Sequence, residues 1–274
     1  MRKPFKITLV SLLTYLGIAS FPTSILAAEG LPPICPQVID FALIPDGIGT
    51  SQKNINRDIL VALEAETGCR FRVLNLPFAR ADAELRTGKV HMSARFFETP
   101  ERLQYLWFAH FQRTKTYAVS QTQELKLNEW SQLTKDPTLR IGTVRGFIHG
   151  DAIDQMLNEV RSTAPLRISE FRDRQVLFEA LLSNRVQIIF LPSSIVHVMT
   201  KEAGLSDTAL SLYDPDPAAE GRPGGLVMSK AFFKDEQAAY WQSAVQRICE
   251  NGTVLRIFQK YFPANASDVS CMMK

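Results

Sequence analysis

The residues best suited to bind a charged solute begin at Arg102. The run Thr99-Pro100-Glu101-Arg102 predicts the start of a helix, because Thr is a favoured N-cap residue and Pro is favoured in the first turn. A cation near a helix N-terminus is unfavourable unless an anion compensates it. The planar guanidinium can hold a carboxylate through two parallel hydrogen bonds. Arg102 is therefore our first ligand-binding candidate, and the alternative is a surface arginine paired with Glu98 or Glu101.

The loop before that helix is bulky. Arg95, Phe96 and Phe97 occupy it, between an expected strand and the helix cap. Two adjacent aromatic residues in such a loop suggest stacking on a flat solute, so all three residues are candidates for ligand contacts. The alternative is that at least one of the two rings packs inward, under the helix.

A second candidate loop lies further along the chain. Arg145, Gly146, Phe147 and Ile148 follow a predicted strand and precede a predicted helix, where α/β proteins commonly contact ligands. The backbone N–H groups of this loop could bind an anionic oxygen. Alternatively, Gly146 only permits a tight turn.

Signals of catalysis are weak. The chain contains no His-Glu-x-x-His cluster, no nucleophile motif of the Gly-x-Ser-x-Gly type and no phosphate-binding Gly-x-x-x-x-Gly-Lys loop, and Gly47-Ile48-Gly49 lacks the third glycine of a dinucleotide loop. We therefore predict no metal, no cofactor and no catalytic residue, although a single carboxylic acid would leave no signature. The dispersed histidines are His91, His110, His149 and His197.

The composition is that of a globular protein. The 274 residues are 46% hydrophobic, with 31 Lys+Arg against 28 Asp+Glu. Three of the basic residues, Arg2, Lys3 and Lys6, lie in a segment that we expect to be removed, which leaves 28 basic residues against 28 acidic ones. A neutral mature chain lacks the charge that nucleic-acid binding needs.

Residues 1–28 are typical of a signal peptide. A basic head precedes an apolar stretch from Ile7 to Phe21, and Pro22 and the Ala27-Ala28 end suit a cleavage site. We therefore expect export to the periplasm and cleavage. The alternative is an uncleaved membrane anchor. No other window is long and apolar enough to cross a membrane, so we expect a soluble mature protein.

Strand and helix patterns alternate in two sets, which predicts an α/β protein with a largely parallel sheet in the first set. The first set of expected elements is 38–43, 54–67, 69–74, 79–87, 89–93 and a helix from 99. The second set is 139–144, 151–160, 166–171, 174–182, 186–191 and 193–203, followed by 226–229, 235–249 and 254–262. Two such units suggest two lobes with a cleft between them.

The four cysteines predict disulfides, because an even count in an exported protein favours them. Of the three pairings we favour Cys35 with Cys69 and Cys249 with Cys271, since each pair then joins segments of one predicted lobe. Four free thiols in the core are the alternative.

Several short motifs together resemble the family 3 periplasmic solute-binding proteins, the extracellular components of ABC transporters, many of which bind amino acids. Their order and spacing carry the resemblance, which spans nearly all of the expected mature chain. The motifs are 76–80 (LPFAR), 84–88 (ELRTG), 99–102 (TPER), 141–146 (IGTVRG) and 251–262 (NGTVLRIFQKYF).

The resemblance implies a periplasmic binding protein-like fold of type II. Two α/β lobes would be joined by two crossover strands and would close on a small solute, with residues 29–117 and 224–274 in one lobe and 118–223 in the other. The arginine that matches Arg102 grips a carboxylate in this family, and Arg80 would lie beside the cleft, unless it is a solvated helix residue near Asp82. We expect a monomer that meets a membrane permease.

One departure affects the expected solute. Amino-acid-binding members usually carry an acidic residue shortly after the third strand of the second lobe, whereas this chain has Leu191-Pro192-Ser193-Ser194 there. Gln187 and His91 stand where an Asp often ends the family's Gly-x-x-Asp pattern. The sequence therefore fits a carboxylate without a free amine, or an aromatic solute, as well as it fits an amino acid.

Two other functions remain open at this point. The protein could instead hand a ligand signal to a membrane receptor. Some proteins of this fold are dehydratases that act on cyclic acids, and an aromatic loop beside Arg102 would suit such a substrate. We expect binding without catalysis.

Overall fold

The computed structural model describes residues 35, 38–44, 55–121, 130–206, 208–217, 221–262 and 271. The chain divides into two units, Met1–Gly30 and Leu31–Lys274, and every described residue belongs to the second. The predicted signal peptide and the Gly47-Ile48-Gly49 turn therefore lie outside the described residues. Within the described part, no helix has the length and apolar character that a membrane span requires.

A five-stranded sheet forms one half of the described fold. Its strand order is β2-β1-β3-β10-β4, and β1 runs parallel to β2 and β3, whereas β10 runs antiparallel to β3 and β4. The predicted parallel arrangement of the first-set strands is confirmed for β1, β2 and β3, whereas β10, which comes from the C-terminal part of the chain, runs antiparallel to both of its neighbours. The strands are β1 (Ile39–Leu43), β2 (Phe71–Asn75), β3 (Met92–Phe97), β4 (Leu106–Thr114) and β10 (Arg222–Ser229).

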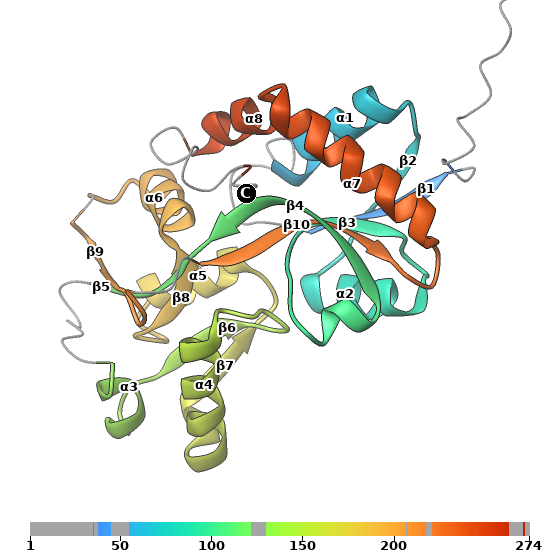
Figure 1. The fold of residues 1–274 in the computed structure, drawn as a ribbon. Helices are drawn as coiled ribbons and strands as arrows, with labels where there is room; N and C mark the ends of the chain where they lie inside the picture. The colour runs from blue at the N-terminus through green and yellow to red at the C-terminus, as the bar shows by residue number, and fades with distance from the viewer. Residues whose placement is uncertain are drawn as a thin grey trace, which may run out of the picture. The chain divides into compact units, whose positions relative to one another are not determined.

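Four helices pack on this sheet. Helices α1, α7 and α8 contact one another on one face, and α2 lies on the other (Figure 1). The predicted helical period of α1 is confirmed, since Ile55, Ile59 and Leu63 are all buried. Gly88, at φ 74°, ends α2. The helices are α1 (Ile55–Thr67), α2 (Phe78–Thr87), α7 (Asp235–Glu250) and α8 (Thr253–Tyr261).

A second group of strands is smaller. The antiparallel order β8-β5-β9 forms one sheet, and β6 pairs with β7 in parallel. A parallel bridge from Ile141 to Ile188 lies beside β6. The strands are β5 (Thr116–Gln121), β6 (Ile141–Val144), β7 (Ile168–Phe171), β8 (Ile189–Pro192) and β9 (Leu210–Tyr213). The helices are α3 (Gln132–Lys135), α4 (Asp151–Thr163), the 3₁₀ turn η2 (Pro165–Arg167), α5 (Arg174–Leu182) and α6 (Ser193–Glu202).

Within the residues that the structure describes, the chain crosses between the two groups of strands twice. Lys115 alone separates β4 from β5, and the chain returns between β9 and β10. The crossings lie side by side, since Lys115 Nζ is 2.7 Å from Asp214 Oδ2 and Arg113 Nη1 donates to the Gly221 carbonyl at 3.1 Å. Gly221 has φ +85°, and a Cβ there would be 2.8 Å from the Thr114 carbonyl. These crossings match the pair of crossover strands implied by the resemblance.

Several elements differ from the sequence predictions. The helix expected from residue 99 is only a turn followed by the 3₁₀ helix η1 (Arg102–Gln104). The strand expected at 89–93 begins later, because the N–H groups of Lys89 and Val90 donate to the Glu84 carbonyl and close α2. Strands β4 and β5 were not predicted, because the polar residues from Gln112 onward indicated a connection.

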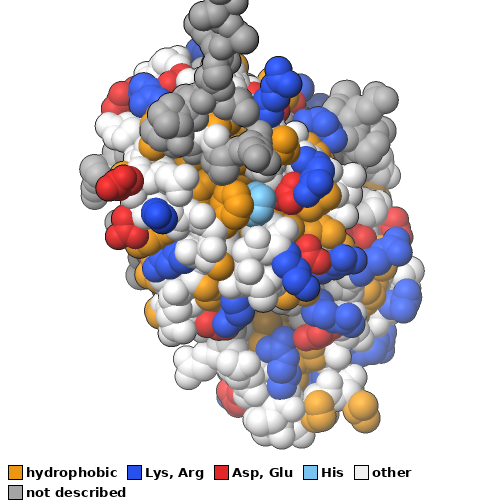
Figure 2. All heavy atoms as spheres, turned by 90° about the vertical axis from the view of Figure 1, so that its right-hand side faces the viewer, with side chains coloured by type: hydrophobic (Ala, Val, Ile, Leu, Met, Phe, Trp, Pro, Cys, Tyr) orange, Lys and Arg blue, Asp and Glu red, His pale blue; other side chains and the backbone are white. Residues whose placement is uncertain are grey.

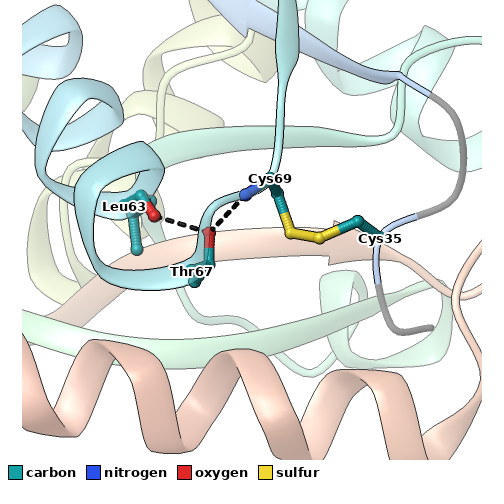
Figure 3. The surroundings of a disulfide bond; sticks show 4 residues. All are labelled: Cys35, Leu63, Thr67 and Cys69. Carbon is teal, nitrogen blue, oxygen red and sulfur yellow. Dashed lines mark hydrogen bonds between the residues drawn. A yellow bond between two sulfur atoms is a disulfide. The ribbon is translucent and has the colours of Figure 1, made fainter. Parts of the chain in front are cut away.

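Both predicted disulfides are confirmed. Cys35 is bonded to Cys69, and Cys249 is bonded to Cys271. Figure 3 shows Thr67 beside the first bond, where its hydroxyl donates to the Leu63 carbonyl at 2.6 Å and accepts from the Cys69 N–H at 3.2 Å. This pair of hydrogen bonds completes the end of α1 and positions Cys69. The N–H of Cys271 donates to a β4 carbonyl at 2.7 Å, so the second bond lies beside the five-stranded sheet.

Basic and acidic side chains lie interspersed on the face that Figure 2 shows, which is the right-hand side of Figure 1. The ion pairs of α2 are of this mixed kind, with Arg80 bound to Glu84 at 2.7 Å and Arg86 bound to Glu101 at 2.6 Å. Exposed pairs of this type contribute little stability. The mixture of signs argues against a nucleic-acid surface on this face.

Candidate functional site

A pocket lies at the carboxyl ends of β1, β3, β6 and β7. Ligands of α/β proteins commonly bind at this edge of a parallel sheet. The pocket has a cavity volume of about 30 Å³, which holds about two water molecules. Its lining residues are Ile44, Asn56, Phe78, Ala94, Arg95, Phe97, Arg102, Phe147, Ile148 and Arg174.

Arg102 is the most deeply buried cation in this lining, with 3% of its surface exposed. Its Nη1 donates to the Phe97 carbonyl at 3.1 Å, and its Nη2 donates to the Gly146 carbonyl at 3.5 Å. The guanidinium lies 5.1 Å from the Phe78 ring centroid and 5.2 Å from that of Phe96. Cation–π contacts at these distances hold the side chain in place without using its N–H donors.

The local structure around Arg102 confirms the predicted cap but not the helix dipole. Its backbone N–H donates to Thr99 Oγ1 at 3.2 Å, as an N-cap predicts. The helix that follows has only three residues, so its dipole is negligible and the electrostatic argument from a helix N-terminus is wrong here. The alternative ion pairs are also not formed, because Glu101 binds Arg86 and Glu98 binds His110.

Asp82 supports Arg102 from α2. One of its oxygens lies 3.6 Å from Arg102 Nε and accepts a hydrogen bond from the Tyr105 hydroxyl at 3.0 Å. Burial, and then the charge of Asp82, raise the pKa of Tyr105 to about 12. The hydroxyl therefore stays protonated and keeps donating to Asp82.

The three predicted residues of the bulky loop have different positions. Phe97 is half-buried and lines the pocket, as Arg95 does. Phe96 is fully buried and stacks on Phe78, with 4.6 Å between the ring centroids. Phe96 thus supports the wall from behind, which is the inward packing that the sequence allowed for one ring.

The second predicted loop contributes side chains rather than N–H donors. The N–H groups of Arg145 and Phe147 donate to the carbonyls of Phe171 and Val144, so the expected anion site on these two groups is not formed. The Phe147 ring lies 4.8 Å from the Phe78 ring and lines the pocket. Gly146, at φ +78°, makes the tight turn.

Two predicted arginines point elsewhere. The Arg145 side chain is 69% exposed and lies 3.5 Å from Glu170. The Arg80 side chain is 67% exposed and binds Glu84 at 2.7 Å, one helical turn along α2. Arg80 is thus a solvated helix residue, paired with Glu84 rather than Asp82.

Sequence reasoning missed Phe78 and Arg174. Arg174 is the first residue of α5, and its guanidinium lies 4.7 Å from the Phe147 ring centroid. The sequence did contain a signal for Arg174. Asp173-Arg174 follows a predicted strand and precedes a helix, which is the same placement that made the Arg145 loop a candidate. Asp173 caps α5, with Oδ1 accepting from the Val176 N–H at 2.9 Å.

His149 makes the stability depend on pH. Its ring is buried and bonded to the Thr143 hydroxyl at 2.6 Å, and burial, followed by the charges of Arg174 and Arg161, lowers its pKa to about 3. Below about pH 6.5 the His149 side chain of the unfolded chain binds a proton, whereas that of the folded chain stays neutral. Acidification therefore favours unfolding. We expect the free energy of unfolding to fall by about 2 kcal/mol from pH 7 to pH 5 through this group.

The comparison that checks this uses urea denaturation of the wild-type protein and His149→Gln at both pH values. The variant is expected to lose less stability on acidification. Asp154, whose pKa is raised mainly by burial, is present in both proteins and cancels from the comparison. An equal loss in both proteins would mean that His149 does not carry the effect.

The family model of the bacterial extracellular solute-binding proteins, family 3, matches residues 54–264. Among solved structures, an ancestral arginine-binding protein bound to arginine is similar with a TM-score of 0.67 and 16% identity, covering 83% of this chain and 99% of that one. The arginine-, lysine-, histidine-binding protein ArtJ from Geobacillus stearothermophilus has a TM-score of 0.66 and 16% identity, covering 82% and 95%.

A third similar structure is the ancestral amino acid-binding protein AncCDT-1, a precursor of cyclohexadienyl dehydratase, with a TM-score of 0.65 and 16% identity, covering 82% of this chain and 96% of that one. Identities this low show the shared fold alone. No curated protein matches the sequence. The family match, the two crossings and the pocket at the carboxyl ends of the strands agree, and the chain belongs to the family 3 bacterial extracellular solute-binding proteins.

Proposed function

We propose that the protein binds a small carboxylate-bearing solute in the Arg102 pocket and delivers it to the permease of an ABC transporter. The observation that carries this proposal is a buried guanidinium in a pocket whose walls come from both groups of strands. A guanidinium in such a place binds a carboxylate more strongly than one in water does. The family match supports the transport role.

A carboxylate has an evident place beside Arg102. The bond from Nη2 to the Gly146 carbonyl is 3.5 Å long, which is long for a charged donor. An anionic oxygen that replaced this carbonyl would form a shorter, charge-assisted bond. Binding would therefore exchange a weak contact for a strong one at the guanidinium.

Hinge closure is the mechanism that we propose. Phe97 and Arg102 belong to the segment before the first crossing, whereas Phe147 and Arg174 belong to the segment between the crossings. Rotation at Lys115 and Gly221 would separate these walls and admit the solute. Contacts of the solute with both walls would then favour the closed form.

This mechanism keeps the proposed lobes of 29–117 with 224–274 and of 118–223. The single residue between β4 and β5 supports a boundary at Lys115, two residues before the predicted one. We also keep the proposals of a cleaved signal peptide at 1–28, a periplasmic location and a monomer. The mass of the exported protein tests export and cleavage of the signal peptide. Its elution volume in size-exclusion chromatography tests whether it is a monomer.

Binding without catalysis is supported by the chemistry of the described lining. Its polar side chains are Asn56 and three arginines, which offer hydrogen-bond donors to an anion rather than a carboxylic acid or an imidazole for proton transfer. The similarity to a dehydratase precursor keeps the enzyme as an alternative. A sensor that signals to a membrane receptor is the alternative within binding.

A thermal-shift screen of amino acids, monocarboxylates, dicarboxylates and aromatic acids tests the binding function. We expect at least one carboxylate class to raise the melting temperature, and isothermal titration calorimetry then gives the affinity. A screen in which only compounds without a carboxylate bind would contradict the proposal. Conversion of the bound compound, followed by NMR, would favour the dehydratase.

Uptake of the labelled solute by cells separates the transporter from the sensor. A strain that lacks the protein is expected to lose uptake and to regain it on complementation. Normal uptake together with a lost transcriptional or behavioural response would instead identify a sensor.

A further inference from the structure

We propose that Phe147 determines the size of solute that the protein accepts, because its ring divides one cleft into two chambers. This inference rests on the proposed function and adds the residue that limits which solutes fit. The first chamber is the Arg102 pocket. The second, which we call the Asp173 cavity, has a volume of about 50 Å³ and is lined by Ile44, Pro77, Phe78, Val144, Phe147, Arg172 and Asp173.

The two chambers share their central residues. Ile44, Phe78 and Phe147 line both the Arg102 pocket and the Asp173 cavity. Phe78 begins α2, before the first crossing, whereas Phe147 lies between β6 and α4, after that crossing. The two rings meet edge to face, with 4.8 Å between their centroids and an interplanar angle of 72°. This contact between the two walls is therefore also the partition between the chambers.

Each chamber is small. The Arg102 pocket holds about two water molecules and the Asp173 cavity about four. A cavity of about 150 Å³ is needed to enclose benzene, so neither chamber encloses an aromatic acid by itself. Joining the chambers is the change that enlarges the enclosed space without altering the contacts behind Arg102.

Phe147 is the ring of the pair that can move. Phe78 is buried and stacks on the fully buried Phe96, and the guanidinium of Arg102 lies 5.1 Å from its centroid. Phe147 is half-buried and belongs to the turn that connects β6 to α4. Its N–H donates to the Val144 carbonyl at 3.0 Å, which fixes the backbone of the turn but not the side-chain torsions. Phe78 is therefore the fixed wall, and Phe147 is the gate.

The turn brings the gate against the opposite wall. A Cβ on Gly146 would lie 3.4 Å from the Ala79 Cβ, so the two walls approach to ordinary van der Waals distance here. The Phe147 side chain packs against two hydrophobic clusters, one that contains Phe78 and one that contains Val144. These apolar contacts are lost when the walls separate, so the ring favours a closed cleft before any solute binds.

The gate therefore has two effects that can be measured. It holds the walls together without solute, and it keeps a solute bound at Arg102 from extending into the Asp173 cavity. A Phe147→Ala protein is expected to lack both effects. Its walls separate more easily, and a long rigid acid gains affinity relative to a short one.

Spin-label distances in the unliganded protein test the first effect. Val61→Cys on α1 and Leu166→Cys in η2 provide labelling positions that are 56% and 98% exposed, one on each side of the first crossing. The four native cysteines are bonded in pairs and do not take up the label. We expect Phe147→Ala to broaden the distribution of distances between the two labels, because the ring no longer holds the walls.

Phe232→Ala is the matched control. Phe232 is also half-buried, and its ring meets that of Phe233 edge to face, at 4.8 Å and 79°. It lies between β10 and α7 and lines neither chamber. The control thus loses the same kind of ring contact away from the cleft. Its distance distribution and its preference among acids are expected to match those of the unaltered protein.

Calorimetry with benzoate and biphenyl-4-carboxylate tests the second effect. The two acids share a carboxylate and one ring, and the second ring of the larger acid has the size of the ring that Phe147→Ala lacks. We expect the affinity for biphenyl-4-carboxylate relative to benzoate to rise at least tenfold in this variant. Binding of the larger acid by the variant alone counts as the same result. Phe147→Leu removes less volume and is expected to give a smaller rise.

The inference requires both results, so the absence of either overturns it. A distance distribution equal to that of the control, or an affinity ratio within threefold of the unaltered protein, is such an absence. Melting curves establish that each variant is folded, and Phe147→Leu replaces Phe147→Ala in both tests if the latter is not.

Failure of the gate and failure of the proposed function give different results. If the unaltered protein binds a carboxylate and Phe147→Ala behaves like the control, only the gate is refuted. If neither acid binds any of the proteins, the gate is also refuted. The proposed function falls only if the wider carboxylate screen yields no ligand.

Discussion

Arg102→Ala is expected to weaken binding of the carboxylate solute by about 10²- to 10³-fold. Removing one member of a buried, hydrogen-bonded charge pair typically costs 2–5 kcal/mol, and each 1.4 kcal/mol is a factor of ten in affinity. The effect is large because Arg102 is almost fully buried, so water does not replace the lost hydrogen bonds. Calorimetry with the best ligand of the screen measures it.

The same substitution is expected to lower the stability of the unliganded protein. The guanidinium contacts the rings of Phe78 and Phe96 and donates to the Phe97 carbonyl. Losing these contacts costs about 2 kcal/mol, which for a chain of this size lowers the melting temperature by about 4–8 °C. A surface arginine would show no such loss.

Two controls separate charge from geometry. Arg102→Lys keeps the charge but loses the planar pair of donors, so an intermediate affinity is expected. Arg256→Ala removes an exposed arginine of α8 and is expected to leave the affinity unchanged. Unaltered binding by Arg102→Ala would exclude this residue from the site.

Loss of the disulfides is the second large effect. The bond from Cys249 to Cys271 spans 22 residues, and the bond from Cys35 to Cys69 spans 34. Their loss favours the unfolded chain by about 3 and 4 kcal/mol, since longer loops are freed. Replacing either pair with serine is expected to lower the melting temperature by roughly 6–16 °C.

Thiol alkylation before and after reduction checks the bonds themselves. Protein exported by the cell is expected to react at no cysteine until it is reduced, and at four afterwards. Four reactive thiols in the unreduced exported protein would contradict both pairings. A melting temperature that reduction leaves unchanged would show that the bonds form but contribute no stability.

Much of the fold was predictable because local patterns determine it. The apolar period of Ile55, Ile59 and Leu63 specified α1, and Gly88 specified the end of α2. The end of strand β4 was missed because Gln112, Arg113 and Thr114 are polar and indicated a connection. Gln112 is polar yet buried, and its side-chain oxygen accepts a hydrogen bond from Arg95. The two residues come close to each other only in the folded sheet.

The candidate site was predictable in part for the same reason. Arg102 carries a local signal, since Thr99 caps the turn in which it lies. Phe78 and Arg174 come from elements that precede and follow Arg102 in the chain, and they meet at the pocket only through tertiary packing. The sequence therefore indicated Arg95 and Arg102 but not Arg174.

The single residue between β4 and β5 has a practical consequence. Any rotation of one group of strands against the other has to be absorbed by a few backbone torsions near Lys115 and Gly221, so it follows a narrow path. Because the rotation follows one path, binding of a solute in the pocket produces one defined change in the distance between the two groups of strands. Two fluorophores, one on α4 and one on α7, would therefore turn this chain into a ratiometric reporter of its own ligand.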